Sequence, residues 1–179
     1  MTRAEAHAVL ERERLAIDPS NLASPIMQLK AELVDALLTV GVRPAEMSAI
    51  TRQDAVQMAV LTCTEGARFD LGVSWLQVLK RHGLDMDALG NANYTALMMG
   101  AQFCPPETVS FLLAEGADHG RQSAQSFTPL SLALYTGGDD TARVLIDAGA
   151  RVSTEAKQAI GEYQQVPGMR ALLEEATLR

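Results

Sequence analysis

The chain has 179 residues and a formal net charge of −7; hydrophobic residues make up 47% of it and aromatic residues only 4%. It has no long apolar run and its N-terminal stretch is interrupted by glutamates, so neither a membrane span nor a signal peptide is expected. The two cysteines, Cys63 and Cys104, lack the spacing of a zinc site or a disulfide framework. We therefore expect a cytoplasmic protein with no metal and no cofactor.

Residues 1–50 are expected to form an N-terminal helical cap or a degenerate repeat. Apolar residues at helical spacing predict one helix over residues 3–17 and another that begins at Pro25 and ends at Gly41. The positions expected to face inward in these helices are Ala8, Leu10, Leu15, Ile26, Leu29, Leu33, Leu37 and Leu38.

Helix pairs are also expected on both sides of the central region. Residues 51–83 predict a degenerate repeat that closes at Gly83. Residues 152–179 predict two capping helices, which suit the end of a stack because a terminal unit has no neighbour to cover its outer face. The helices expected in these two segments span residues 54–63, 73–82, 154–163 and 169–178.

The central residues, 84–151, repeat with a period of 33. Thr95-Ala96-Leu97 and Thr128-Pro129-Leu130 lie one period apart, and Gly116-Ala117 and Gly149-Ala150 keep the same interval. A fixed period of this length is typical of stacked helical units, each of which buries its apolar face against the next.

This period and the Thr-Pro-Leu opening at Thr128 resemble the ankyrin repeat. The resemblance implies an all-α solenoid of stacked helix-turn-helix units, with two well-matched repeats over residues 84–151 and atypical helical caps at both ends of one continuous domain. It also implies that Thr95 and Thr128 cap the first helices, and that Gly116 and Gly149 end the second helices in the left-handed conformation.

Cys104 occupies the turn position that Gly137 holds one repeat later. Pro105 and Pro106 follow it and favour the start of a new helix, so we expect a turn of different shape. Cys104 is then either a reactive thiol or a small semi-buried filler, and the filler is favoured.

The resemblance implies that partners bind to the loop tips and to exposed positions of the first helices, which together line a concave surface. Carried over residue by residue, these positions are Asn91, Tyr94, Gln102, Phe103, Glu115, Gln125, Phe127, Tyr135 and Thr136. Four of them are aromatic in an aromatic-poor chain, and exposed aromatic side chains are typical of recognition surfaces. Alternatively, Phe103 packs under the Cys104 turn, and Tyr94 or Phe127 staples a loop to its own helix.

The acidic excess is concentrated in the centre of the chain. Residues 84–151 hold eight acids and three bases, a net charge of −5, whereas the segments before and after carry −1 each. Such a surface disfavours nucleic acid and anionic membranes, so the expected partner is another protein, and a basic one if it is charged. Improved solubility is the other explanation of the same charge.

Few residue patterns favour catalysis. His7, His82 and His119 are each far in sequence from one another, and no phosphate-binding glycine loop or nucleophile elbow occurs. We therefore expect neither an enzyme nor a small-molecule substrate, and a small hydrolase is the weakest alternative.

Two binding roles remain open on the sequence alone. In the first, the protein is an adaptor whose concave face docks a regulatory partner. In the second, it is a dedicated inhibitor, such as an immunity protein that covers the active site of a toxin. The central acidic excess favours a basic target for such an inhibitor, because complementary charge speeds association.

Overall fold

The computed structural model describes residues 1–18, 30–42, 60, 77–83, 85–89, 93–152, 171 and 174. The chain falls into two compact units, Met1–Asp85 and Met86–Arg179. The regular elements among the described residues are helices, with no strand, as the sequence predicted. None of the helices in these ranges is long and apolar enough to cross a membrane. The continuity of both units as one solenoid, and the predicted boundaries of its caps and repeats, stay predictions.

In the first unit, α1 (Arg3–Arg12) packs against α3 (Ala31–Thr39). A capping box starts α1: the Thr2 hydroxyl accepts from the Glu5 N–H, and the Glu5 carboxylate accepts from the Thr2 N–H at 2.7 Å. The Thr2 backbone N–H, and to a lesser extent its hydroxyl, hold the pKa of Glu5 below the ordinary 4.5. The cap is therefore complete at neutral pH and weakens only as the pH falls through that lowered pKa.

The helix α1 is shorter than predicted and buries a different face. It ends at Arg12, because the chain turns left-handed at Arg14, with a φ of 53°. Its buried residues are Ala6, Val9 and Leu10. The prediction that Ala8 faces inward was wrong, since Ala8 is exposed. The prediction placed Leu15 on the same helical face as Ala8. Because α1 ends at Arg12, helical spacing does not extend to Leu15.

The helix α3 ends where the sequence predicted. Gly41 follows its C-cap with a φ of 108°, and the buried residues include Leu33, Leu37 and Leu38. The predicted start of this helix at Pro25, with Ile26 and Leu29, lies outside the described residues. Residues 77–81 are helical and confirm the end of the helix predicted over 73–82. Most residues of the three other predicted helices lie outside the described residues; these helices were expected over 54–63, 154–163 and 169–178.

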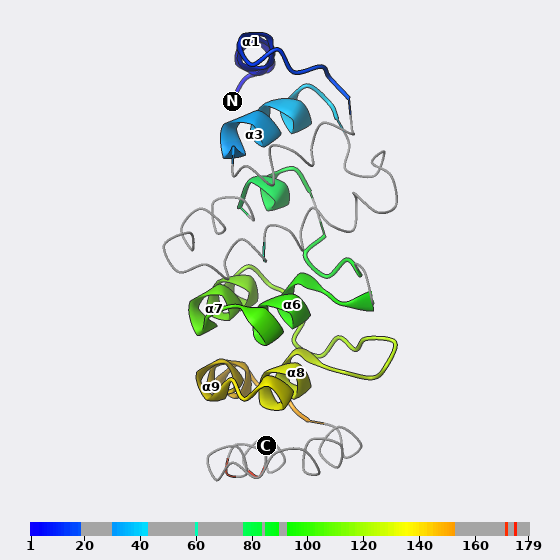
Figure 1. Cartoon of the computed structure of the whole chain (residues 1–179), viewed down its shortest axis with the longest axis vertical. Helices are drawn as coiled ribbons and strands as arrows, with labels where there is room; N and C mark the ends of the chain where they lie inside the picture. The colour runs from blue at the N-terminus through cyan, green and yellow to red at the C-terminus, as the bar shows by residue number, and fades with distance from the viewer. Residues whose placement is uncertain are drawn as a thin grey trace. The chain divides into compact units, whose positions relative to one another are not determined.

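The helices described over residues 93–152 of the second unit form two pairs (Figure 1). The first pair is α6 (Ala96–Phe103) and α7 (Pro106–Ala114), and the second is α8 (Pro129–Thr136) and α9 (Asp139–Asp147). Within each pair the helices contact one another, and between the pairs α6 packs on α8 and α7 on α9. The two helix-turn-helix units are therefore stacked, first helix on first helix and second on second.

Threonine side chains start both first helices. The hydroxyl of Thr95 accepts from the Met98 N–H at 3.2 Å, and that of Thr128 accepts from the Ser131 N–H at the same distance. Both threonines are buried, so each hydroxyl satisfies an amide that water does not reach. Pro129 follows Thr128 at the first helical position, where its missing N–H leaves no bond unmade.

Both second helices end in the same hydrogen-bonded closure. In α7 the Ala117 N–H donates to the Leu112 carbonyl at 3.0 Å, and in α9 the Ala150 N–H donates to the Leu145 carbonyl at 2.9 Å. The residue before each donor is a left-handed glycine, with a φ of 91° at the first closure and 93° at Gly149. The predicted helix ends are therefore confirmed.

The turns inside the two helix pairs differ, as expected. Gly137 is left-handed, with a φ of 79°, whereas Cys104 is extended, with a φ of −109° and a ψ of 162°. The following residue, Pro105, disfavours helical backbone at Cys104 and explains the extended conformation. Cys104 is buried, which agrees with a filler rather than a reactive thiol.

Replacement of Gly149 by valine is expected to lower the free energy of unfolding by about 1–2 kcal/mol, because a β-branched residue is strained in the left-handed region. Apart from the residue itself and its two chain neighbours, no atom lies within 4 Å of the added Cβ, so the loss comes from the backbone and not from a clash. Gly149→Asn is the matched control and should lose less, since asparagine enters this region more readily. Thermal unfolding of the full chain measures both, and an unchanged midpoint for Gly149→Val contradicts the closure described above.

Thr108 lies in the first turn of α7 with a fully buried hydroxyl that has no hydrogen-bond partner. Thr108→Val keeps the shape and removes the unpaired group, so we expect the free energy of unfolding to rise by about 1 kcal/mol. Thr128→Val is the control, because it removes a buried cap and should lower stability by about the same amount. Urea unfolding compares them; two changes of the same sign would overturn this assignment.

Candidate partner-binding surface

Two exposed aromatic side chains lie at the ends of the first helices. Phe103, the last residue of α6, is 51% exposed, and Tyr135, near the end of α8, is 48% exposed. Because α6 packs on α8, both rings lie at the same end of neighbouring helices. The alternative in which Phe103 packs under the Cys104 turn is therefore wrong.

Two of the predicted polar residues accompany these rings. Gln102 is half-buried beside Phe103 in the sequence, and Thr136 is exposed beside Tyr135. The Thr136 hydroxyl donates to two carbonyls of its own helix, at 3.1 and 3.2 Å. We call these four the turn-end residues, because they directly precede the turns into the second helices.

The other described residues of the predicted surface lie at the opposite end of the first helices. Tyr94 and Phe127 directly precede the two N-caps, and both are half-buried. Gln125 is exposed in the loop before α8, and Glu115 is half-buried at the C-cap of α7. An eight-residue helix is about 12 Å long, so these four loop-end residues form a separate group. Asn91 lies outside the described residues.

Hydrogen bonds hold the loop that carries part of the loop-end group. The Ser123 N–H donates to the Phe127 carbonyl at 2.8 Å, and the Ser123 hydroxyl accepts from the Phe127 and Gln125 N–H groups at 3.1 and 3.3 Å. The carboxylate of Asp87 accepts from the Asp118 N–H at 2.9 Å and ties this loop to the preceding one. No sequence motif signalled this link between loops.

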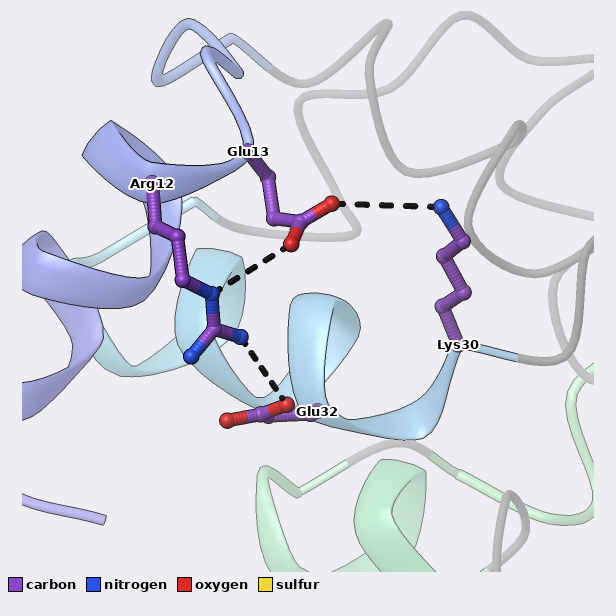
Figure 2. A network of polar contacts seen from close by, with 4 residues as sticks. All are labelled: Arg12, Glu13, Lys30 and Glu32. Carbon is purple, nitrogen blue, oxygen red and sulfur yellow. Dashed lines mark hydrogen bonds and ion pairs between the residues drawn. The ribbon is translucent and has the colours of Figure 1, made fainter.

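A polar network lies in the first unit, between the end of α1 and the start of α3 (Figure 2). Arg12 pairs with Glu13 and with Glu32, each at 3.3 Å, and Lys30 pairs with Glu13 at 3.9 Å. These side chains line an open pocket of about 400 Å³. All four are well exposed, so the pairs add little stability, and their balanced charges favour neither an anion nor a cation.

A histidine and an aspartate that are distant in the sequence meet in the first unit. His82 Nε2 lies 2.8 Å from Asp35 Oδ1, which joins α3 to the helix over residues 77–81. The pair spans 47 residues, across the degenerate repeat, so local spacing gave no signal for it. Hydrolysis requires a nucleophile and a base that converge, and this pair alone supplies no nucleophile.

Comparisons with known proteins agree with the stacked helix pairs. Residues 67–156, about half of the chain, match a family model described as ankyrin repeats in three copies. The chain belongs to the ankyrin-repeat family, whose repeats form a protein-interaction module. It is also similar to glycerophosphocholine phosphodiesterase gde1 of Schizosaccharomyces pombe, with 32% identity over 127 residues that cover 70% of this chain and 11% of that protein.

Removal of the Asp35 carboxylate is expected to destabilise the first unit. Asp35→Ala leaves the His82 side chain, which is only 22% exposed, without this partner, so the free energy of unfolding should fall by about 1–2 kcal/mol. The double variant with His82→Ala should lose less than the sum of the two single variants, because they remove the same interaction. Chemical unfolding of all three tests this, and strictly additive losses would show that the two side chains do not interact.

Proposed function

We propose that this protein binds another protein through the concave face and loop tips of its ankyrin repeats. The observation that carries this proposal is the exposure of Phe103 and Tyr135 on stacked first helices of a chain with only 4% aromatic residues. Aromatic side chains supply a large, rigid contact area at a low entropic cost. The proposed contacts are Asn91, Tyr94, Gln102, Phe103, Glu115, Gln125, Phe127, Tyr135 and Thr136.

The turn-end residues and the loop-end residues contribute differently to the proposed surface. The turn-end residues offer exposed rings, whereas the half-buried Tyr94 and Phe127 support the loop and present only part of each ring. A cytoplasmic location belongs to the same proposal and rests on two cysteines without disulfide spacing. We propose no catalytic activity, because the similarity to the phosphodiesterase covers only 11% of that protein.

The charge of the central repeats supports a second candidate function. In this case the protein is an inhibitor or immunity protein that neutralises a basic toxin or enzyme. Residues 84–151 carry a net charge of −5, and complementary charge speeds the association of an inhibitor with its target. An assay of the captured partner's activity, with and without this chain, separates an inhibitor from an adaptor.

Capture of the natural partner tests the proposed contacts. The tagged full chain is purified from its native cells beside the double variant Phe103→Ser and Tyr135→Ser, which removes exposed rings and leaves the core intact. We expect the variant to retain at least roughly tenfold less partner, because the loss of even one central aromatic contact costs about 2 kcal/mol or more, which exceeds tenfold in affinity.

The matched control is Ile17→Ser, which removes an exposed apolar side chain, 52% exposed, from the first unit. It should capture as much partner as the original chain. Undiminished capture by a folded double variant contradicts the contact role of the two rings. In that case a loop-end variant, Gln125→Ala, is compared next, because it alters an exposed side chain without touching the core.

A further inference from the structure

The side chain that links two successive loops is replaced by glycine one repeat later. In the first pair of loops the Asp87 carboxylate accepts from the Asp118 N–H at 2.9 Å. One period of 33 residues further along the chain, Gly120 corresponds to Asp87 and Arg151 corresponds to Asp118. Glycine has no side chain that can accept a hydrogen bond. The repeat that contributes a carboxylate to the first link therefore contributes none to the second.

The backbone that leads to Arg151 matches the backbone that leads to Asp118. The helices α7 and α9 pack on one another, and the Ala117 and Ala150 N–H groups make the same closure to a leucine carbonyl. Asp118 and Arg151 directly follow these two alanines. The repeat therefore places Gly120 beside the Arg151 N–H, as it places Asp87 beside the Asp118 N–H. Within the part of the chain that the structure describes, the Arg151 N–H has no hydrogen-bond partner.

Two exposed arginines accompany this position. One is Arg151 itself, and the other is Arg121, which directly follows Gly120. Among the described residues, neither guanidinium takes part in a hydrogen bond or an ion pair. Residues 84–151 hold eight acids and only one further base, Arg143. A backbone donor and two positive charges are therefore gathered in a region that is otherwise acidic.

We propose that Gly120, Arg121 and Arg151, which we call the Gly120 site, bind the carboxylate of an aspartate or glutamate side chain of a partner protein. This inference rests on the proposed binding function and specifies the chemistry of one contact at the loops. The partner's carboxylate accepts from the Arg151 N–H, as the Asp87 carboxylate accepts from the Asp118 N–H. The guanidinium groups add charge-assisted hydrogen bonds to the same carboxylate.

The negative charge around the Gly120 site restricts its ligand to a single carboxylate. The Asp118 carboxylate accepts from the Gly120 N–H at 2.8 Å and so lies directly beside the site. Its charge disfavours a dianion such as phosphate, and the acidic excess of residues 84–151 disfavours nucleic acid. A carboxylate carries one negative charge and already occupies the equivalent position one repeat earlier. A partner that is basic elsewhere can present such a residue here.

Titration of the full-length chain with a small probe tests the inference. The probe is a glutamate whose amino and α-carboxyl groups are capped, and the backbone N–H resonances of Arg121 and Arg151 are followed by nuclear magnetic resonance. We expect saturable shifts at millimolar concentrations of this probe and none with capped glutamine, which has the same shape without the charge. Binding to Arg121→Gln with Arg151→Gln should be roughly tenfold weaker, because two charged donors are removed.

A second variant supplies the carboxylate from within the chain. Gly120→Asp restores the residue found at Asp87, and the backbone allows it, since Gly120 is not among the glycines with a positive φ. The new Cβ lies 3.2 Å from an oxygen of Asp118, so that side chain shifts slightly. The same spacing of two aspartates occurs at Asp85 and Asp87. We expect Gly120→Asp to abolish the saturable shifts, and the matched neutral variant Gly120→Asn to weaken binding less.

The control for net charge is Arg14→Gln, which removes an exposed arginine from the first unit. Its affinity for the capped glutamate should differ by less than about twofold, because only screened charge is lost. The thermal melting of each variant is measured first, so that binding is compared only between folded chains.

Several results would overturn the inference. Equal binding of capped glutamine is one, and tighter binding of inorganic phosphate, or of acetylalanine with its chain-end carboxylate, is another. Equal losses in Gly120→Asp and Gly120→Asn would show that space and not charge decides binding, which also overturns it. If Gly120→Asp captures the natural partner undiminished while Phe103→Ser with Tyr135→Ser does not, the proposed function stands and this inference fails.

Discussion

Each second helix ends in a hydrogen bond between the backbone carbonyl of a buried leucine and the N–H of the residue that follows a left-handed glycine. Leu112 and Leu145 are fully buried, and each carbonyl accepts from the residue that follows a left-handed glycine. In the first unit α3 closes in the same way at Leu37, and α1 closes at Leu10 although Arg14 replaces the glycine. The leucine anchors the helix in the core while the left-handed residue sets the direction in which the chain leaves. The closure therefore fixes where each helix ends and where the next loop begins.

The features that the sequence predicted are those that depend on a few adjacent residues and recur at a fixed interval. The threonine caps, the glycine ends and the altered turn at Cys104 are of this kind, because each follows from local backbone chemistry. The face of α1 was mistaken at Ala8, since a non-glycine residue in the left-handed conformation, Arg14, gave no sign that the helix ended before Leu15. The bond between Asp35 and His82 had no local signal, because it depends on how the intervening chain folds.

Only some residues of the predicted binding surface are exposed. Phe103 and Tyr135 are exposed, but Tyr94 and Phe127 are half-buried, since they precede the N-caps where the loop meets its helix. A repeat pattern assigns equivalent positions but does not show how far apart they lie. Once the length of the first helices is known, the positions separate into the loop-end group, whose Gln125 and Phe127 take part in loop hydrogen bonds, and the turn-end group, which contains both exposed rings. A partner that contacts only one group needs a footprint much smaller than the whole predicted surface.

The hydrogen bond from the Asp118 N–H to the Asp87 carboxylate connects the loops of two successive repeats. Repeats of this type are often regarded as cassettes that can be exchanged, duplicated or deleted. Here the acceptor for the Asp118 N–H is a side chain of the preceding repeat. A repeat that is transferred from its first helix onward therefore loses the Asp87 carboxylate. A recombined protein keeps this hydrogen bond only if Asp87 is transferred together with the loop that contains Asp118.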